Sequence, residues 1–269
     1  MSAGTIVLVG CGQMGSAMLR GWLAGGAASR YVVVEPAGVP EALARGDAIE
    51  THAAPGVLAD TLVPDAVVFA VKPQGINDIV PAYRRFARPQ TVFMSIAAGT
   101  TIANLAKHLG DAAIVRVMPN TPAAIGRAIS VACANGRVTG AQRQLCDALL
   151  AAIGESAWVE DEALLDPVTA VSGSGPAYVF LLIETLAEAG RQAGLPADLA
   201  LRLSTATVAG AGELARVSTE APGKLRENVT SPGGTTRAAL DVLMGDEGLA
   251  ELMVRAVAAA TRRSRELAS

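Results

Sequence analysis

Residues 5–15 read Thr-Ile-Val-Leu-Val-Gly-Cys-Gly-Gln-Met-Gly, an apolar run that leads directly into a glycine-rich turn. Apolar residues then recur at helical spacing, at Met14, Met18, Leu19, Trp22 and Leu23. The order strand, Gly-x-Gly-x-x-Gly, helix is typical of a dinucleotide-binding site. The first glycine permits the tight turn, the second lets the backbone approach a pyrophosphate, and the third packs the helix against the strand.

A pyrophosphate at this turn would lie against free N–H groups at a helix N-terminus, where the helix dipole favours negative charge. A second apolar run, Tyr31-Val-Val-Val34, ends in Glu35, twenty residues after Gly15. An acidic side chain at this position can accept hydrogen bonds from both hydroxyls of an adenosine ribose. We therefore expect a nicotinamide or flavin nucleotide site. The alternative is a glycine turn that only packs, as in Rossmann folds that bind no nucleotide.

The composition excludes several classes of protein. The 269 residues carry a net charge of −3, and Lys and Arg are scattered, so we expect no nucleic-acid partner. No apolar run reaches the ~18 residues of a membrane span, and the chain enters the glycine turn by residue 10 without a charged leader. Cys11, Cys133 and Cys146 lack metal-ligand spacing. They predict free thiols in a reducing cytoplasm and no metal site.

The first half of the chain alternates predicted strands and helices. Further strands are expected at residues 66–71, 92–96, 113–117, 129–133 and 156–159, with helices over 102–109 and 141–153. The strands are short, nearly continuous apolar runs, which is typical of a parallel sheet buried on both faces. Beyond about residue 160 only helices are expected, over 162–171, 176–194, 197–217, 234–244 and 247–267.

This pattern predicts an α/β fold class with two domains. A doubly wound Rossmann domain is expected over residues 1–160 and an all-helical domain over residues 161–269. Several of the C-terminal helices are alanine-rich nearly all round, for example 205–215 and 254–261. About a hundred residues cannot bury so many apolar faces alone, so we expect the helical domain to pair with a second copy of itself.

Strong acid–base groups are scarce. His52 and His108 are expected at the surface, whereas Lys72 follows a strand at the edge where open α/β sheets bind ligands. Tyr178, at the start of a helix, is a weaker candidate. A substrate that needs little proton transfer fits this shortage, since a protonated C=N bond accepts hydride without forming an alkoxide.

Two turns in the helical half are suited to an anion such as a carboxylate. Residues 173–176 read Gly-Ser-Gly-Pro and residues 231–236 read Ser-Pro-Gly-Gly-Thr-Thr, and each turn opens a helix. Free backbone N–H groups and hydroxyls at a helix N-terminus attract negative charge. The alternative is ordinary capping by Ser or Thr. Two glycines followed by two threonines exceed what a cap requires, which favours a functional second turn.

Together these pieces resemble the pyrroline-5-carboxylate reductase family. The matching motifs keep the family's order over nearly the whole chain: Val-Gly-Cys-Gly-Gln-Met-Gly at 9–15, Ala-Val-Lys-Pro at 70–73, Ser-Ile-Ala-Ala-Gly at 95–99, Arg-Val-Met-Pro-Asn-Thr-Pro at 116–122, Val-Ser-Gly-Ser-Gly-Pro-Ala-Tyr at 171–178 and Ser-Pro-Gly-Gly-Thr-Thr at 231–236. The last motif, with residues 225–230 before it, is close to a signature of this family. The resemblance implies a Rossmann domain followed by a helical dimerisation domain, with dimers often assembled into a decamer. It also implies hydride transfer from NADH or NADPH to C5 of 1-pyrroline-5-carboxylate, giving L-proline in the last step of proline biosynthesis.

The resemblance also assigns residues to the two ligands. The cofactor residues would be Gly10, Cys11, Gly12, Gln13, Met14 and Gly15 at the pyrophosphate, Glu35 at the ribose, and Ala70, Val71, Lys72, Pro73, Ile96, Ala97, Ala98 and Asn120 towards the nicotinamide. The substrate residues would be Glu162, Ser174, Asn228, Ser231, Gly233, Gly234, Thr235 and Thr236. Thr236 would act in catalysis, through a hydrogen bond from its hydroxyl to the ring nitrogen.

Two departures from the family pattern bear on specificity. Many relatives have Ser, Asn or Arg after the second strand, where the 2′-phosphate of NADPH must fit, whereas Glu35 here is followed by no cation before Arg45. This predicts a preference for NADH. Some relatives have a glutamate near the substrate where Thr219 stands, and the adjacent Glu220 could replace it.

Two other functions remain as alternatives. A β-hydroxyacid dehydrogenase of related fold would need a lysine base in the helix over 177–194, which contains none. A dinucleotide-binding sensor or scaffold would not need the Gly-Gly-Thr-Thr turn.

Overall fold

The computed structural model describes residues 3–44 and 46–268, so Arg45 lies outside the described residues. The chain forms two compact units, Met1–Gly173 with Ala260–Ser269, and Ser174–Ala259. The predicted division between residues 160 and 161 therefore differs from the division into compact units, and it stays a prediction about domains.

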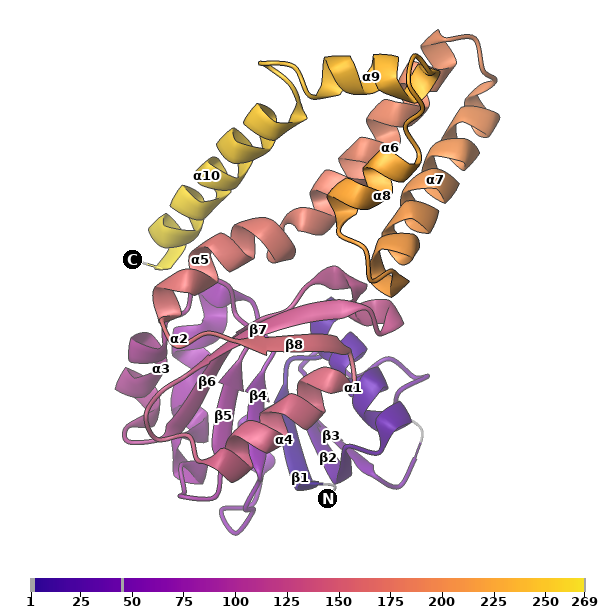
Figure 1. Cartoon of the computed structure of the whole chain (residues 1–269). Helices are drawn as coiled ribbons and strands as arrows, with labels where there is room; N and C mark the ends of the chain where they lie inside the picture. Colours follow the sequence, from indigo (N-terminus) through magenta and orange to yellow (C-terminus); the bar gives the residue numbers. More distant parts are fainter. Residues whose placement is uncertain (1–2, 45, 269) are drawn as a thin grey trace. The chain divides into compact units, whose positions relative to one another are not determined.

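The first unit is built on an eight-stranded sheet (Figure 1). In chain order its strands are β1 (Ala3–Val9), β2 (Ala28–Val34), β3 (Ile49–His52), β4 (Ala66–Phe69), β5 (Val92–Ser95), β6 (Ala113–Met118), β7 (Ala128–Ala134) and β8 (Gly154–Trp158). Their spatial order is β3-β2-β1-β4-β5-β6-β7-β8. The crossover from β3 past β2 and β1 to β4 is the arrangement of a Rossmann fold, and the predicted fold class is confirmed.

Two strands, β7 and β8, run against the prediction of a parallel sheet. The pairs from β3 to β6 are parallel, but β7 is antiparallel to β6, and β8 is parallel to β7. Only residues 119–127 connect β6 to β7, including the short turn η4 (Thr121–Ile125). A parallel crossover needs a dozen or more residues, so this connection can only reverse the chain.

Helices cover both faces of the sheet. Alternate strand residues divide between two cores, with Ile6 and Leu8 on one face and Val7 and Val9 on the other. The first face packs under α1 (Gln13–Gly25) and α4 (Gly140–Ala151), where the Trp22 indole N–H donates to the Leu149 carbonyl at 2.9 Å. The second face packs under α2 (Ile76–Ile79), η3 (Val80–Phe86) and α3 (Ile102–Leu109).

The helix expected over 162–171 is divided into three short pieces. These are η5 (Glu162–Leu164), α5 (Leu165–Val168) and the π-helical turn η6 (Thr169–Gly173). The short strand β3 and the short helix α8 (Pro222–Asn228) were not predicted, because four to seven residues hold too little periodicity for assignment.

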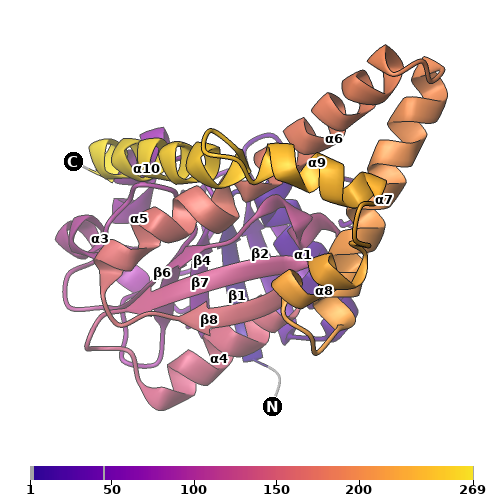
Figure 2. The same ribbon diagram turned by 45° about the horizontal axis from the view of Figure 1, so that its top comes forward.

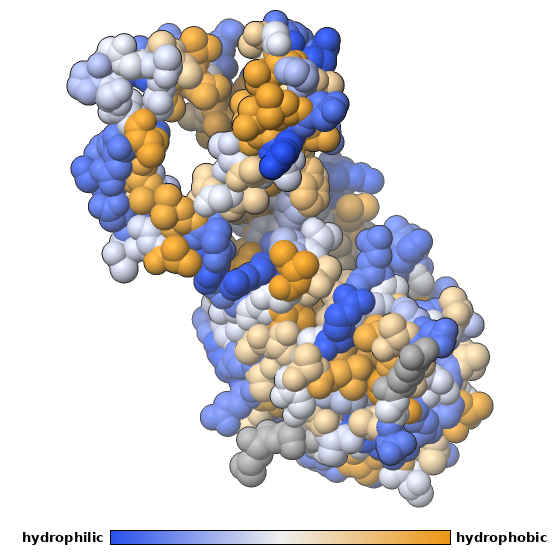
Figure 3. Space-filling model, turned by 90° about the vertical axis from the view of Figure 1, so that its right-hand side faces the viewer, coloured by the Kyte–Doolittle hydropathy of each residue, from blue (hydrophilic) through white to orange (hydrophobic). Residues whose placement is uncertain are grey.

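The second unit consists of helices. α6 (Gly175–Gln192) and α7 (Ala197–Val217) pack as a hairpin (Figure 2), followed by α8, α9 (Thr235–Leu243) and α10 (Leu249–Ala268). From Ala260 onward α10 belongs to the first unit. Large apolar side chains are exposed along α6 and α7, including Phe180 at 58% and Leu201 at 53%. Figure 3 shows such apolar side chains gathered on the helices in its upper part.

Residues 162–192 are long and apolar enough to cross a membrane by length and composition alone, and 6% of the apolar window is buried. One such segment is weak support for a membrane span, because a helix that packs against a second chain has the same composition.

Candidate functional site

The three glycines of the turn after β1 each have a separate geometric reason. Gly10 has φ +91°, and a Cβ there would lie 2.7 Å from the Ala70 carbonyl oxygen. A Cβ on Gly15 would lie 2.3 Å from the Gly10 carbonyl oxygen, so α1 packs directly on the turn. A Cβ on Gly12 would meet nothing within 4 Å. Only Gly12 therefore faces open space, which is the position that must admit a pyrophosphate.

The N-terminus of α1 is open to an anion. Gly12 is its N-cap, no side chain caps the helix, and its first turn contains no acidic residue. The first N–H groups of a helix have no partner within the helix and carry partial positive charge. This helix end therefore presents donors with no competing carboxylate from its own first turn.

Glu35 points towards the glycine turn. Its two carboxylate oxygens accept hydrogen bonds from the backbone N–H groups of Cys11, at 2.7 Å, and Ala37, at 3.0 Å. Pro36 therefore does not turn the side chain outward, away from the glycine turn. The half-buried carboxylate is fixed beside the turn at the carboxyl end of β2.

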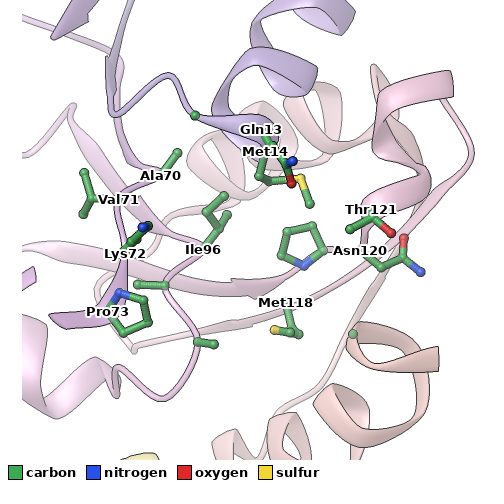
Figure 4. A pocket seen from close by; sticks show the side chains of 15 residues that line it. Gln13, Met14, Ala70, Val71, Lys72, Pro73, Ile96, Met118, Asn120 and Thr121 are labelled. Atoms are coloured by element: carbon green, nitrogen blue, oxygen red, sulfur yellow. The ribbon is translucent and has the colours of Figure 1, made fainter. Parts of the chain in front are cut away.

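Two neighbouring pockets lie along this edge of the sheet, of about 480 Å³ and about 430 Å³, and they share Gly12, Ala70, Val71 and Lys72. The first contains most of the residues predicted for the nicotinamide side (Figure 4): Gln13, Met14, Pro73, Ile96, Ala97, Ala98 and Asn120. The second contains Gly10 and Glu35. Cys11 and Gly15 are buried and line neither pocket. The structure thus brings together predicted cofactor residues from the five segments that follow β1, β2, β4, β5 and β6.

The pockets also contain residues that the sequence analysis did not assign to the cofactor. In the first pocket these include Met118, Pro119, Thr121 and Gly173, and in the second Ala53, Pro55, Asp78, Ile79, Ala82 and Tyr83. Met118 and Thr121 fall within or beside a motif already noted, at the end of β6. Ala53 follows strand β3, which was not predicted. Recognition of that strand would have placed Ala53 at the ligand-binding edge of the sheet.

Asn120 lines the first pocket, but both ends of its amide are engaged. Its Nδ2 donates to the Ser172 carbonyl and its Oδ1 accepts from the Ile129 N–H, each at 3.1 Å. In Figure 4 it lies across the pocket from Val71 and Lys72. The side chain therefore holds the pocket wall together, and its predicted contact with the cofactor stays a prediction.

Glu162 joins two elements of the first unit. Its Oε1 accepts from the Ile102 N–H at 2.8 Å, at the start of α3, and from Arg116 Nη1 at 2.9 Å, on β6. The Arg116 side chain is only 7% exposed, so this carboxylate neutralises a buried charge. Glu162 lines neither of these pockets. Its role as a substrate contact stays a prediction, beside the structural role that these bonds give it.

The Ser231–Thr236 turn of the second unit leaves a helix N-terminus uncapped. The Ser231 carbonyl accepts from the Gly234 N–H at 3.1 Å, and Gly233 has φ +68°, which favours glycine. Gly234 is the N-cap of α9, without a side-chain cap bond, and the Thr236 hydroxyl has no hydrogen-bond partner among the described residues. The capping interpretation is therefore wrong for this turn.

The other predicted substrate residues lie in the same unit. Ser174 is the N-cap position of α6 and makes no cap bond with its side chain. Asn228 ends α8, and its Nδ2 donates to Glu220 Oε2 at 2.9 Å. Glu220 therefore contacts a predicted substrate residue, which the sequence alone did not indicate.

The thiols have no sign of redox chemistry. Cys11, Cys133 and Cys146 are free and buried. Burial raises the pKa of each thiol, that of Cys146 to about 12, so the thiols stay protonated and unreactive near neutral pH.

Comparison with known proteins matches both parts of the chain. A family model described as pyrroline-5-carboxylate reductase dimerisation matches residues 162–267, and one described as NADP oxidoreductase, coenzyme F420-dependent, matches residues 5–99. With the glycine turn and its pockets, these matches define a nicotinamide-dinucleotide oxidoreductase that has a helical dimerisation domain.

Relatives along the whole chain define the family. The chain is 39% identical to a pyrroline-5-carboxylate reductase of Pseudomonas aeruginosa, covering 100% of this chain and 98% of that protein. The structure of a pyrroline-5-carboxylate reductase from Coxiella burnetii matches with a TM-score of 0.91 and 32% identity, over 100% of both chains. That of a Plasmodium falciparum pyrroline carboxylate reductase with NADP bound matches with a TM-score of 0.84 and 28% identity, again over 100% of both. The chain belongs to the pyrroline-5-carboxylate reductase family.

Proposed function

We propose that this chain reduces 1-pyrroline-5-carboxylate to L-proline with NADH in preference to NADPH, and that the Ser231–Thr236 turn binds the substrate. The reaction class follows from family membership: the chain is an NAD(P)H-dependent oxidoreductase that acts on a cyclic imine. The observation that supports the cofactor preference is the position of the Glu35 carboxylate at the glycine turn.

The residues of the site act mainly by positioning the substrate and the cofactor relative to each other. When bound, the reduced nicotinamide supplies the hydride for the imine carbon. The open N-terminus of α9 offers N–H groups for the substrate carboxylate, and the unpartnered Thr236 hydroxyl can hydrogen-bond the ring nitrogen. An imine that is already protonated needs no strong general acid. Catalysis by orientation and by fixed donors fits a chain with few acid–base groups.

The charges of the second pocket support NADH. Glu35 and Asp78 both line it, and Lys72 is the single cation among its described lining residues. The Glu35 carboxylate can accept from the ribose hydroxyls of NADH, but it would repel the 2′-phosphate of NADPH. The Plasmodium relative has NADP bound, so the preference proposed here for this chain is not carried over from that relative.

Assembly and location belong to the same proposal. The exposed apolar side chains of α6 and α7, together with the match to a dimerisation domain, support a homodimer. We extend this to dimers that assemble into a decamer, on the resemblance to the family. The free thiols support a cytoplasmic location, where thiols stay reduced.

An activity panel tests the reaction. The purified protein is assayed for NADH and NADPH oxidation with 1-pyrroline-5-carboxylate, and for NAD⁺ and NADP⁺ reduction with a set of β-hydroxyacids. We expect turnover only with the cyclic imine. Turnover of a β-hydroxyacid without turnover of the imine would replace the proposal with the related dehydrogenase, and NADH binding without any turnover would favour a sensor.

A further inference from the structure

The loop that follows β5 forms one wall of the first pocket. Residues 96–98 line that pocket, on the side predicted for the nicotinamide. The next residue, Gly99, has φ +74°, in the region that favours glycine. The far end of the loop is held by the hydrogen bond from the Ile102 N–H to Glu162. A contact at Gly99 can therefore hold or move the pocket wall beside it.

The last turn of α10 packs on Gly99. A Cβ on Gly99 would lie 2.9 Å from the Leu267 carbonyl oxygen and 3.3 Å from the Leu267 Cβ, so only glycine leaves room for the helix. The Leu267 side chain is largely exposed, so the contact is made by atoms at or next to the backbone. Both residues belong to the first unit, although they are distant in the chain. The glycine therefore serves the close approach of the helix end, which the motif at 95–99 did not indicate.

A hydrogen bond holds this end of α10 against α5. Ser264 Oγ donates to Asp166 Oδ1 at 2.7 Å, and Asp166 Oδ2 lies 3.8 Å from Arg265 Nε. Ser264 is the only buried residue among the described residues of α10, and the Asp166 side chain is 13% exposed. In both Figure 1 and Figure 2 the C-terminal end of α10 lies beside α5. A bond to a carboxylate is stronger than one between neutral groups, so this bond can fix the helix end.

We infer that the end of α10 positions the nicotinamide-side wall of the cofactor pocket, with Leu267 packed on Gly99 and Ser264 bonded to Asp166. The inference rests on the proposed use of a nicotinamide dinucleotide. Residues 96–98 line the first pocket and not the second, which contains Glu35. Release of the helix end should therefore loosen the nicotinamide half of the site and leave the adenosine half unchanged.

Two variants release the helix end in different ways. A chain lacking residues 266–269 loses Leu267 but keeps the Ser264 bond, whereas Ser264→Ala loses that bond but keeps the helix. Calorimetric titration measures the affinity for NADH and for ADP-ribose, which carries the adenosine and pyrophosphate but no nicotinamide. We expect both variants to weaken NADH binding about three- to thirtyfold and to leave ADP-ribose binding unchanged. Arg263→Ala is the matched control, because it removes the same Arg263–Glu266 ion pair as the shortened chain and should change neither affinity.

A double-mutant cycle tests the contact itself. Gly99→Ala strains the backbone in either chain because of the positive φ, but its Cβ meets Leu267 only when residues 266–269 are present. We expect Gly99→Ala to weaken NADH binding by a larger factor in the full chain than in the shortened chain, with a difference of about threefold or more.

Three results would overturn the inference. One is wild-type NADH affinity of Ser264→Ala or of the shortened chain. A second is equal weakening of NADH and ADP-ribose in both variants, which would mean that the whole first unit is destabilised; if the shortened chain alone does so, Ser264→Ala decides. The third is an equal effect of Gly99→Ala in the two chains. Failure of the wild-type protein to bind NADH would instead contradict the proposed function.

Discussion

Replacement of Glu35 tests the proposed cofactor preference. Its carboxylate is held by the N–H groups of Cys11 and Ala37, so it cannot swing away without losing two hydrogen bonds. Glu35→Ser removes the charge and most of the side chain. Glu35→Gln removes the charge alone, because the amide oxygen can still accept from one of the two N–H groups.

The expected magnitude follows from Coulomb's law. Charges of −1 and about −2 that lie about 5 Å apart repel by about 2 kcal/mol in bulk water, and by about 7 kcal/mol at an effective dielectric constant of about 20. Glu35 is half-exposed, so the lower value is the better guide. About 2 kcal/mol corresponds to roughly a 30-fold preference for NADH in kcat/KM.

Steady-state kinetics with both cofactors at saturating 1-pyrroline-5-carboxylate measures this preference. We expect wild type to favour NADH by about 30-fold, and both variants to reduce the preference to a few-fold or reverse it. If Glu35→Gln keeps the full preference while Glu35→Ser loses it, side-chain shape and not charge is the cause. A wild-type preference for NADPH of tenfold or more would refute the reasoning.

Three further outcomes are expected. Thr236→Ala should lower kcat/KM for 1-pyrroline-5-carboxylate by about ten- to a thousandfold without changing the Kd of NADH, whereas Thr230→Ala, whose hydroxyl bonds to the Arg226 carbonyl, should change neither. Wild-type kinetics of Thr236→Ala would remove that hydroxyl from the mechanism. Gly12→Ala should leave the free energy of unfolding in urea within about 1 kcal/mol of wild type but weaken NADH binding at least about tenfold, whereas Gly10→Ala should lose about 2 kcal/mol or more of stability. Equal stability of these two variants would contradict the assigned glycine roles. The full chain should sediment as a dimer or larger at micromolar concentration, because α6 and α7 expose large apolar side chains, and a folded monomer would exclude this.

Local patterns in the sequence were enough for the fold class and for much of the cofactor site. The apolar run before Gly10 and the glycine spacing predicted strand, turn and helix, because each depends on residues close together in the chain. The same is true of Lys72 and Ile96, which follow predicted strands and therefore lie at the ligand-binding edge. The antiparallel direction of β7 could also have been predicted, since the connection of residues 119–127 is too short for a parallel crossover.

The direction of each functional side chain depended on contacts between distant parts of the chain. Glu35 points to the glycine turn because its carboxylate accepts a hydrogen bond from the Cys11 N–H, 24 residues away in the chain. Glu162 neutralises Arg116, 46 residues away, and Tyr83 joins a pocket with residues of β2 and of the loop after β3. The periodicity of a sequence shows which face of a helix or strand is apolar. It carries no information about hydrogen bonds between elements that are distant in the chain. The sequence by itself therefore determined the elements and the edge of the sheet that carries the cofactor pockets, whereas the tertiary structure decided which polar groups are paired and which, such as the Tyr83 hydroxyl, have no partner among the described residues.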